Sequence, residues 1–591
     1  MGKKSKAKKL LRQQMEAANA EKELKKGKNK PKKKEEKKIH FRINKKKIFG
    51  GILVLIMLAI LVAVGYLIFE RAFRAQPIAK FLPSESTVAL LEINTNFDHT
   101  QLNKTFELLK NHPDYSKEKL IGYIEKLFNL NYEIDLKPWL GREAGVAYLN
   151  SAKDTNAVYT LFFAEVLSQN NVEKFLQKYS PVENVYIGNK TYAIKFPAGM
   201  TYVTFVGDYL FAGTNEQAIF QVIDAQNSTT EKLYATEKYR KVDNNLPLNR
   251  TAFVFFNFDQ LSDGFLHELP FMDKISMITI KPFIKSFDAE GLALVALNKD
   301  FAIQTFLTLH STNSNNSSYL SFEKKYNADL ADYLSKDTLA FWGGRNLEAE
   351  LQKTVSAFTG GQDSNRLIVD QILQAYTQRY FGQSTIFKDD ILPLFKNEFA
   401  FAVEKLNNKN VYKFIFELDS AQTDAVKLHQ LANNFASYGG IFEPKVVEHT
   451  LPDGTVGKEI VAAPEEITKN ESNYAGTTIY ELKMGKENWS LYYTVIGNLA
   501  IITNDPDSLK LSMDLTKSNG ASLSSTGQFS EDIKPIIKGS DEVSYFDFDN
   551  ILPLIFNKQD LPPILDIVSS FSSGKNYFDD GVVSINYLHI K

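Results

Sequence analysis

A run of 22 uncharged and mostly apolar residues, Ile48–Phe69, constrains this chain more than any other feature. At 1.5 Å per residue, a helix of this length crosses the hydrocarbon core of a bilayer, which is about 30 Å thick. The 47 residues before it carry 20 Lys or Arg and 5 Glu, and basic residues beside a span stay on the cytoplasmic side. We therefore expect a single-pass protein of the cytoplasmic membrane, with residues 1–47 inside and 70–591 outside.

The charge of the chain divides at this run. Residues 1–47 have a net charge of +15, so the 522 residues after the run carry −16, with 49 basic and 65 acidic side chains. An acidic exterior disfavours nucleic acid as a partner. Anionic lipid head groups attract a basic tail by about 1 kcal/mol for each nearby Lys or Arg. We expect the tail to be partly disordered and to contact these lipids, without a dedicated cytoplasmic ligand.

A cleaved signal peptide is the alternative interpretation of the apolar run. Its usual apolar region is about 7–15 residues long, and here the charged Glu70 and Arg71 follow where small residues would mark a cleavage site. An uncleaved signal anchor is therefore expected, followed by a short stalk over residues 70–80. The chain has no cysteine, which excludes disulfides, cysteine zinc sites and thiol nucleophiles.

The exterior contains an internal repeat. Residues 202–211 match residues 492–501 at an offset of 290, and 256–259 match 546–549 at the same offset. Earlier in each half the offset is 255, which places Pro138 on Pro393. We therefore expect two tandem extracytoplasmic repeats, 81–310 and 326–591, joined by a Ser/Asn-rich linker over 311–325.

The change of offset predicts a net insertion of 35 residues in the second repeat, between Leu431 and Tyr492. It contains Pro-Asp-Gly at 452–454, a turn signal that suits an added hairpin. Gly-Asp at 207–208 and Gly-Asn at 497–498 each separate two β-like runs, as the two-residue turn of a tight hairpin does. Consecutive hairpins predict an α+β fold, in which each repeat is a mainly antiparallel sheet with helices on one face.

Two motifs carry a family resemblance. They are Leu-Pro-Ser-Glu-Ser-Thr at 82–87, before a β-like run, and Lys-Pro-Trp-Leu-Gly-Arg at 137–142, which leads into Gly-Val-Ala at 145–147. This pattern resembles an uncharacterised bacterial family of exported, membrane-anchored proteins with a domain of unknown function. The resemblance implies an envelope location and assigns no activity or catalytic residue. The second repeat has Leu394, Phe395 and Lys396 where the first has the Trp-Leu-Gly, so a site built on that tryptophan is not duplicated.

Three residues are candidate ligand contacts. Trp139, between Pro138 and Gly141, could stack on a sugar or peptide, although an anchor in the core is the simpler interpretation. Asp547 and Asp549 alternate with Phe residues as in a strand, which places both carboxylates on one face. Paired carboxylates can bind a divalent cation or transfer protons. A solvated face over buried aromatic rings is the simpler account.

Local catalytic motifs are absent from the sequence. Ser116 and Lys119 have the Ser-x-x-Lys spacing of penicillin-interacting enzymes, but no Lys-Thr-Gly follows. The eight His show no metal-ligand spacing, and phosphate-loop, dinucleotide and nucleophile-elbow motifs are missing. We therefore expect no cofactor or metal, and a protein that binds or scaffolds an unidentified envelope partner. A cell-envelope hydrolase with dispersed catalytic residues and an exported chaperone or assembly factor are the alternatives.

Overall fold

The computed structural model describes most of residues 77–591; the longest stretches left out of that range are 269–286, 310–325, 352–362 and 556–562. The predicted tail, the predicted span and the Ser/Asn-rich linker lie outside the described residues. In the part of the chain that is described, no helix combines the length and the apolar character needed to cross a membrane.

The contacts of the chain define two compact units. Unit 1 is Met1–Thr87 with Leu130–Arg240, and unit 2 is Val88–Asn129 with Lys241–Lys591. Both contain helices and antiparallel strands, so the predicted α+β class is confirmed. The units differ from the predicted segments 81–310 and 326–591, because the last strands of both segments pair in one sheet. That the segments 81–310 and 326–591 are two repeats stays a prediction.

Unit 1 is built around a six-stranded antiparallel sheet. Its strand order is β2-β3-β7-β6-β5-β4. Its elements are η1 (Ile78–Lys80), η3 (Tyr132–Leu136), β2 (Leu140–Asn150), β3 (Val158–Val166), α5 (Gln169–Gln177), β4 (Val182–Tyr186), β5 (Asn189–Phe196), β6 (Gly199–Val206), β7 (Tyr209–Gly213), α6 (Glu216–Asn227) and η4 (Leu233–Ala235). Gly207, with φ +59°, and Asp208 connect β6 to β7. The tight hairpin predicted there is confirmed.

The elements of unit 2 include β1 and α7, which cross the unit boundaries. They are β1 (Thr87–Asn94), α3 (Thr100–Leu108), η2 (Pro113–Tyr115), α4 (Lys117–Phe128), α7 (Glu237–Asn245), β8 (Ala252–Asn257), η5 (Phe258–Gln260), α8 (Asp263–Glu268), β9 (Phe287–Ala296), β10 (Asp300–Leu309), η7 (Asp329–Tyr333), β11 (Thr338–Arg345), α11 (Asp363–Phe381), η8 (Phe387–Ile391), η9 (Leu392–Phe395), β12 (Glu398–Leu406), β13 (Lys409–Glu417), α12 (Ala421–Tyr438), β14 (Phe442–Thr450), β15 (Val456–Pro464), β16 (Ile467–Tyr474), β17 (Thr477–Met484), β18 (Ser490–Ile496), β19 (Leu499–Thr503), α13 (Pro506–Leu515), η10 (Leu523–Ser525), η11 (Phe529–Ile533), α14 (Lys534–Ile537), β20 (Glu542–Asp547), α15 (Phe548–Ile555), η13 (Pro563–Ile567), β21 (Val568–Phe578) and β22 (Gly581–Ile590).

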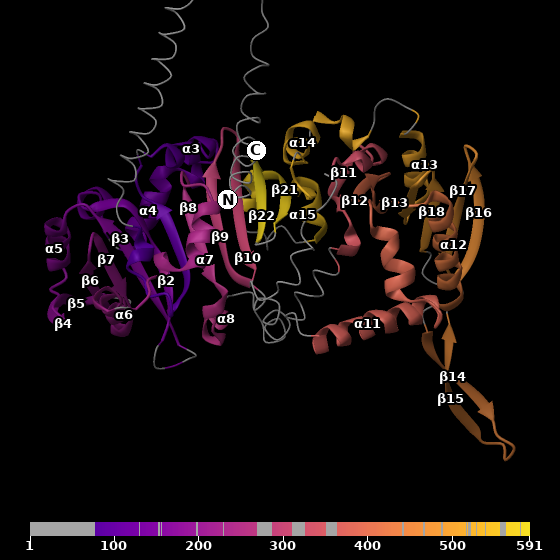
Figure 1. The fold of residues 1–591 in the computed structure, drawn as a ribbon, viewed down its shortest axis with the longest axis horizontal. Coiled ribbons are helices and arrows are strands. Elements are labelled where there is room, and N and C mark those ends of the chain that lie inside the picture. Colours follow the sequence, from indigo (N-terminus) through magenta and orange to yellow (C-terminus); the bar gives the residue numbers. More distant parts are fainter. Residues whose placement is uncertain are drawn as a thin grey trace, which may run out of the picture. The chain divides into compact units, whose positions relative to one another are not determined.

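Most strands of unit 2 form one continuous antiparallel sheet. The order is β1-β8-β9-β10-β22-β21-β20-β11-β12-β13-β19-β18-β17-β16. Within the part of the chain that the structure describes, β14 and β15 pair only with each other, as a separate hairpin whose turn contains Gly454 at φ +84° (Figure 1). The hairpin predicted at Pro-Asp-Gly 452–454 is thus confirmed, and it lies inside the predicted insertion.

The helices of unit 2 cover both faces of the sheet, so the prediction of helices on one face was wrong. Phe399 and Ala400 are neighbours in β12 and therefore point to opposite faces. Phe399 belongs to a buried cluster with Leu428 and Leu431 of α12. Ala400 belongs to a second cluster, which includes side chains of η7, η10, η11 and α14. Both faces of this strand are apolar, and each therefore needs its own covering layer.

Candidate functional site: two buried serine networks

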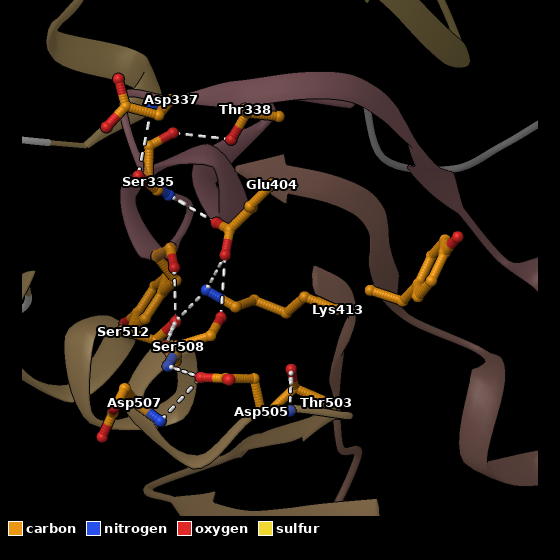
Figure 2. Close-up of polar contacts among 12 residues, drawn as sticks. Ser335, Asp337, Thr338, Glu404, Lys413, Thr503, Asp505, Asp507, Ser508 and Ser512 are labelled. Carbon is orange, nitrogen blue, oxygen red and sulfur yellow. Dashed lines mark hydrogen bonds and ion pairs between the residues drawn. The ribbon is translucent and has the colours of Figure 1, made fainter. Parts of the chain in front are cut away.

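The first candidate site is an ion pair buried between two neighbouring strands of unit 2. The Nζ atom of Lys413 on β13 lies 2.7 Å from Oε2 of Glu404 on β12, and the two side chains are 0% and 1% exposed (Figure 2). Lys413 pairs with Ala402 in the ladder, so Glu404, two residues further along, shares its face. Burial lowers the pKa of Lys413, and the carboxylate of Glu404 acts against this shift.

Two serines of α13 complete this network. Ser508 Oγ donates a hydrogen bond of 2.9 Å to Glu404 Oε2, and Lys413 Nζ donates one of 2.7 Å to Ser512 Oγ. The hydroxyl of Ser512 in turn donates to the carbonyl of Tyr333, also at 2.7 Å. The backbone N–H of Ser335 donates to the other carboxylate oxygen of Glu404 at 2.6 Å. Every charged group in the network therefore has a close partner, as buried charges require.

The position of both serines follows from how α13 begins. The carboxylate of Asp505 accepts hydrogen bonds from the backbone N–H groups of Asp507 and Ser508, at 2.9 and 3.0 Å. This is the pattern of an N-terminal helix cap. Ser508 and Ser512 are four residues apart, so they lie on one face of the helix, turned toward Lys413 (Figure 2).

A lysine beside a serine is one arrangement that can activate a nucleophile. In this network Lys413 donates to Ser512, and the serine proton is directed to a backbone carbonyl. Ser508 and Ser512 are both fully buried. The contact between Lys413 and Ser512 therefore joins α13 to the sheet, and the Ser512 hydroxyl is not accessible to a substrate.

The second candidate site is a hydrogen-bonded chain of Ser572, His589 and Asp300. Ser572 Oγ lies 2.9 Å from Nε2 of His589, and Nδ1 of the same ring lies 3.1 Å from Asp300 Oδ1. The three residues come from the neighbouring strands β21, β22 and β10. This connectivity is that of a Ser-His-Asp triad, in which the carboxylate fixes the imidazole tautomer that accepts the serine proton.

A second carboxylate approaches the same histidine. Asp532 of η11 has its Oδ1 atom 3.5 Å from His589 Nδ1, and its Oδ2 atom accepts a hydrogen bond from Ser570. Burial raises the pKa of Asp532, and the nearby His589 acts against this shift. Two acids from different elements therefore approach the same nitrogen of the imidazole, Nδ1.

The hydrogen-bonded residues Ser572, His589 and Asp300 differ from a working triad because a substrate cannot reach the serine. Ser572 is fully buried in the middle of β21, where it pairs with Tyr545 on one side and Tyr587 on the other. Its backbone groups belong to a ladder that is paired on both sides, so its N–H is not free to stabilise an oxyanion. The arrangement holds three strands and η11 together.

Trp139 lies in the core of unit 1, as the simpler interpretation of the sequence predicted. It is 5% exposed and packs within a cluster that contains Val172 and Leu176 of α5. Its ring centroid lies 6.1 Å from that of Phe175, and its indole N–H donates to the carbonyl of Asp135. The ring is therefore enclosed by protein on its faces and satisfied at its polar edge.

The strand predicted across Asp547 and Asp549 ends between them. β20 stops at Asp547, and α15 begins at Phe548. Asp547 Oδ1 accepts from the backbone N–H of Asn550 at 3.2 Å, while Asp549 pairs with Lys591 at 2.7 Å. Helix capping outweighs the alternating pattern here. The two carboxylates have separate partners, and the described residues contain no His, Asp or Glu cluster able to hold a metal.

Ser116 also has a local role, because its hydroxyl accepts from the backbone N–H of Lys119 at 3.3 Å, at the start of α4. The two serine networks were missed by the sequence analysis. Asp300 and His589 are 289 positions apart, and Glu404 and Ser508 are 104 apart. No local spacing signals contacts of this kind.

Comparison with known proteins gives a family but no activity. A family described as a protein of unknown function, DUF3352, matches residues 48–441. The chain belongs to this family. The resemblance seen in the sequence is confirmed to that extent, while its bacterial and exported character stays a prediction. No curated protein matches the chain.

Solved structures add nothing to this. Crystal form I of TP0453 matches with a TM-score of 0.22 and 11% identity, over 41% of this chain and 81% of that chain. Crystal form IV of the same protein matches with a TM-score of 0.24 and 11% identity, over 43% of this chain and 88% of that one. Likeness at this level supports no argument about function.

Proposed function

We propose that this chain is a single-pass envelope protein, anchored by residues 48–69, whose extracytoplasmic part binds or scaffolds a partner and does not catalyse. The observation that carries the non-catalytic part is the closure of both serine networks. The hydroxyl of Ser512 and that of Ser572 are buried and have protein partners. A nucleophile must reach the reacting atom of its substrate, and neither serine has an open side.

The anchor and the envelope location rest on the sequence alone. The uncharged run, the 20 basic residues before it and the acidic remainder all favour an N-terminus inside and a C-terminal region outside. Protease added to cells with a permeable outer layer should digest the exterior and leave a small membrane fragment. If the exterior is spared until the cytoplasmic membrane is broken, the topology is wrong.

A hydrolase is the second candidate function, and one observation favours it. The Ser572–His589–Asp300 chain has triad distances of 2.9 and 3.1 Å. A rearrangement that lifted η11 from the sheet would expose it, because η11 supplies Asp532 to the same histidine. The exported chaperone or assembly factor has support only from exposed apolar side chains, which occur in both units.

A serine-directed fluorophosphonate probe separates the two candidates. We expect the full-length chain to remain unlabelled, and the Ser572→Ala and Ser512→Ala variants to behave in the same way. Heat-denatured protein serves as the control for non-specific reaction. Labelling of the folded chain that disappears in Ser572→Ala and persists in Ser512→Ala would establish the hydrolase.

We further propose that the extracytoplasmic part arose by duplication. The strand order β2-β3-β7-β6-β5-β4 in unit 1 is repeated as β12-β13-β19-β18-β17-β16 in unit 2. Within unit 2, β1-β8-β9-β10 is similarly repeated as β11-β20-β21-β22. Because both sets of strands recur in the same spatial order, they support a common origin of the two copies.

Local details support the same proposal. The side chain of Asp135 accepts a hydrogen bond from the N–H of Asn131, the N-cap residue of the short π-helix η3. The side chain of Asp390 accepts one from the N–H of Ile386, the N-cap residue of the short π-helix η8, in the same way. The offset of 290 would place Gly291 on Gly581, but Gly291 pairs with Phe255 inside β9, whereas Gly581 begins β22. The offset of 290 therefore ends before the last two strands.

A further inference from the structure

The strand β4 forms the outer edge of the sheet of unit 1. Among the described residues it pairs with β5 alone, and all its residues from Val182 to Val185 are exposed (Figure 1). The strand is nevertheless held firmly, because the ring of Tyr186 stacks on Phe220 of α6 and its hydroxyl donates to the carboxylate of Asp224 at 3.0 Å. β4 is therefore an ordered strand with one side that no described strand covers.

Exposed apolar side chains lie along this edge. Val182, Val185 and Ile187 are 61%, 68% and 58% exposed. Glu183 is the one charged residue of β4, and it is already paired with Lys190 of β5 at 2.8 Å. Natural edge strands commonly carry charges that oppose pairing with another chain. This edge has little of that protection.

The strand at the same place in the order of unit 2 is different. β16 carries Lys469 and Glu471, which are charges of the protecting kind. The turn after β16 has Ala475 where the turn after β4 has Ile187, and their φ angles are +52° and +47°. A β-branched residue is strained in this region. Unit 1 thus places a strained and exposed isoleucine beside an apolar edge, which indicates a contact made there.

We propose that β4 pairs with β4 of a second copy of this chain, antiparallel, about a two-fold axis at Asn184. The hydrogen bonds of the strand set this register. Tyr186 and Asn189 close a two-residue turn, so the bonds to β5 fall on every second residue, counting back from Tyr186. The N–H and C=O groups of Glu183 and Val185 therefore point away from β5. With the axis at Asn184, each Glu183 meets Val185 of the other copy, and the two exchange hydrogen bonds.

Other registers use this edge less well. An axis at Glu183 would set two like charges directly opposite each other, which destabilises a sheet. An axis at Val185 would bring Glu183 against Ile187, where the strand has already ended. With the axis at Asn184, each Glu183 faces a valine instead. Ile187 then reaches Pro181 of the second copy, which has no N–H and ends the ladder.

A second copy suits so short an edge better than an unfolded peptide does. Ordering each residue of a peptide costs more free energy than one hydrogen bond returns, and β4 is only five residues long. The β4 strand of a second copy is already ordered by its own sheet, so it avoids this cost. The two-fold pairing also covers both edges at once. This contact requires no membrane anchor, so it stands apart from the function proposed above.

Single cysteines test the register, because the chain has none of its own. The two Asn184 residues would be a directly opposed pair without hydrogen bonds, about 4.5 Å apart at Cα, which a disulfide can bridge. The two Val185 residues would be diagonal neighbours about 7–8 Å apart, past the separation that a disulfide spans. Under mild oxidation of the full-length chain, we expect Asn184→Cys to give a covalent dimer. Val185→Cys, also on an exposed side chain, should stay uncrosslinked.

Two charge variants at one position test the contact without a covalent bond. Val185→Glu places a like charge opposite Glu183 of the second copy, at both symmetric contacts, and should weaken association about tenfold. Val185→Lys places an opposite charge there and should retain the dimer. Within one copy the preference is reversed, because residue 185 pairs with Lys190 of β5. Melting temperatures therefore exclude misfolding as the cause. Sedimentation equilibrium of the full-length chain in mild detergent measures association.

A variant of the turn separates strain from contact. Asn adopts positive φ more readily than a β-branched residue does. Ile187→Asn should therefore raise the melting temperature and weaken the dimer. Ala475→Asn, at the same turn position of unit 2, is the control and should leave association unchanged.

The outcomes decide between this contact and others. Cross-linking through Asn184→Cys alone, with Val185→Glu weaker than Val185→Lys, establishes it. A chain that stays monomeric at every concentration overturns it, as does equal association of the two charge variants. Cross-linking at both cysteines indicates random collision, and a dimer that neither cysteine cross-links has its contact elsewhere. Either result also overturns the pairing of β4 with β4.

Discussion

Lys413 and Glu404 form an ion pair, 2.7 Å long, at positions where unit 1 has only leucine. In the ladder of unit 2, Lys413 pairs with Thr503 of β19, and at the same point of unit 1 Leu161 pairs with Gly213 of β7. Leu149 of β2 corresponds to Glu404 and is fully buried, as is Leu161. One strand arrangement is therefore compatible with a buried ion pair or with two apolar side chains.

Breaking this pair by one substitution should be costly. Lys413→Leu leaves the carboxylate of Glu404 buried without its counter-charge, and such changes lower the free energy of unfolding by about 3–5 kcal/mol. Urea denaturation of the single variant measures this loss. A change below 1 kcal/mol, of the size found for exposed pairs, would contradict the buried position of the lysine.

Replacing the whole network should be much milder. Glu404→Leu and Lys413→Leu, combined with Ser508→Ala and Ser512→Val, reproduce the apolar set of unit 1, whose helix α6 has Ala218 and Val222. Apolar replacements of buried ion pairs are often neutral or stabilising. We expect the fourfold variant to be more stable than Lys413→Leu alone. If it is less stable, the two sites are not equivalent in packing.

Glu398 should make stability depend on pH near neutrality. Burial, with a smaller contribution from Asp329, raises the pKa of Glu398 from 4.5 to about 7. Because the folded-state pKa is raised, the stabilising effect is complete below pH 4.5 and is lost as the pH rises through about 7. The upper limit of this loss is about 3 kcal/mol. Melting across this window should show lower stability at the alkaline end.

Glu398→Gln is the matched variant for that prediction. The amide cannot ionise, and its oxygen can still accept the backbone N–H of Leu330, which lies 3.3 Å from the carboxylate. The variant should therefore lose most of the pH dependence in this window. Glu448→Gln, on an exposed side chain of β14 that pairs with Lys458, is the control and should retain it. Equal pH profiles for Glu398→Gln and the parent chain would place the titrating group elsewhere.

Asp547 should matter for stability more than Asp549. Loss of a helix-capping carboxylate costs about 1 kcal/mol, so Asp547→Ala should lower the melting temperature. Asp549→Ala removes only an ion pair with Lys591, in which the aspartate side chain is 54% exposed, and should have a smaller effect. Calcium and magnesium should not raise the melting temperature. A rise that both substitutions abolish would restore the cation site.

Short-range features of the fold could be predicted from the sequence. The turns at Gly207 and Gly454 both require a positive φ, which glycine adopts without strain, so local residue types signalled them. The prediction of a strand through Phe548 was wrong because alternation continued past the point where Asp547 caps a helix. Alternation with a period of two does not show where a helix cap falls. Only the tertiary position of α15 decides between a continued strand and a helix that begins at Phe548.

Long-range features could not be predicted in this way. His589 meets Asp300 through the pairing of β22 with β10, and no sequence pattern specifies which strand edges meet. The covering of both faces of β12 was missed for a related reason. Phe399 and Ala400 are both apolar, and such a continuous run fits either a half-buried or a fully buried strand.

Trp139 should behave as a core residue in mutagenesis. Trp139→Ala removes a buried ring from the cluster around Val172 and should lower the free energy of unfolding by about 3–5 kcal/mol. Trp139→Phe keeps most of the apolar volume and should cost less, although Asp135 loses the indole donor to its carbonyl. Denaturant titration compares the two. A sugar-stacking role would instead leave stability unchanged in Trp139→Ala.

The hairpin of β14 and β15 should be removable. Its two ends meet, because Phe442 pairs with Pro464, and paired residues of an antiparallel ladder are about 5 Å apart. Two glycines can therefore replace residues 442–464. The hairpin pairs with no other strand among the described residues, so the melting temperature should change little.

The matched control is removal of the hairpin of β16 and β17, residues 467–484. This hairpin belongs to the main sheet, since β17 pairs with β18, and Ile479 and Leu482 are buried. Its loss should abolish cooperative unfolding, because large buried side chains each contribute several kcal/mol. Under the duplication, the first hairpin is an addition to the second copy, while the second belongs to the shared core. Equal damage from the two deletions would contradict that assignment, because an inserted hairpin that pairs with no strand of the sheet cannot be as necessary as one that completes it.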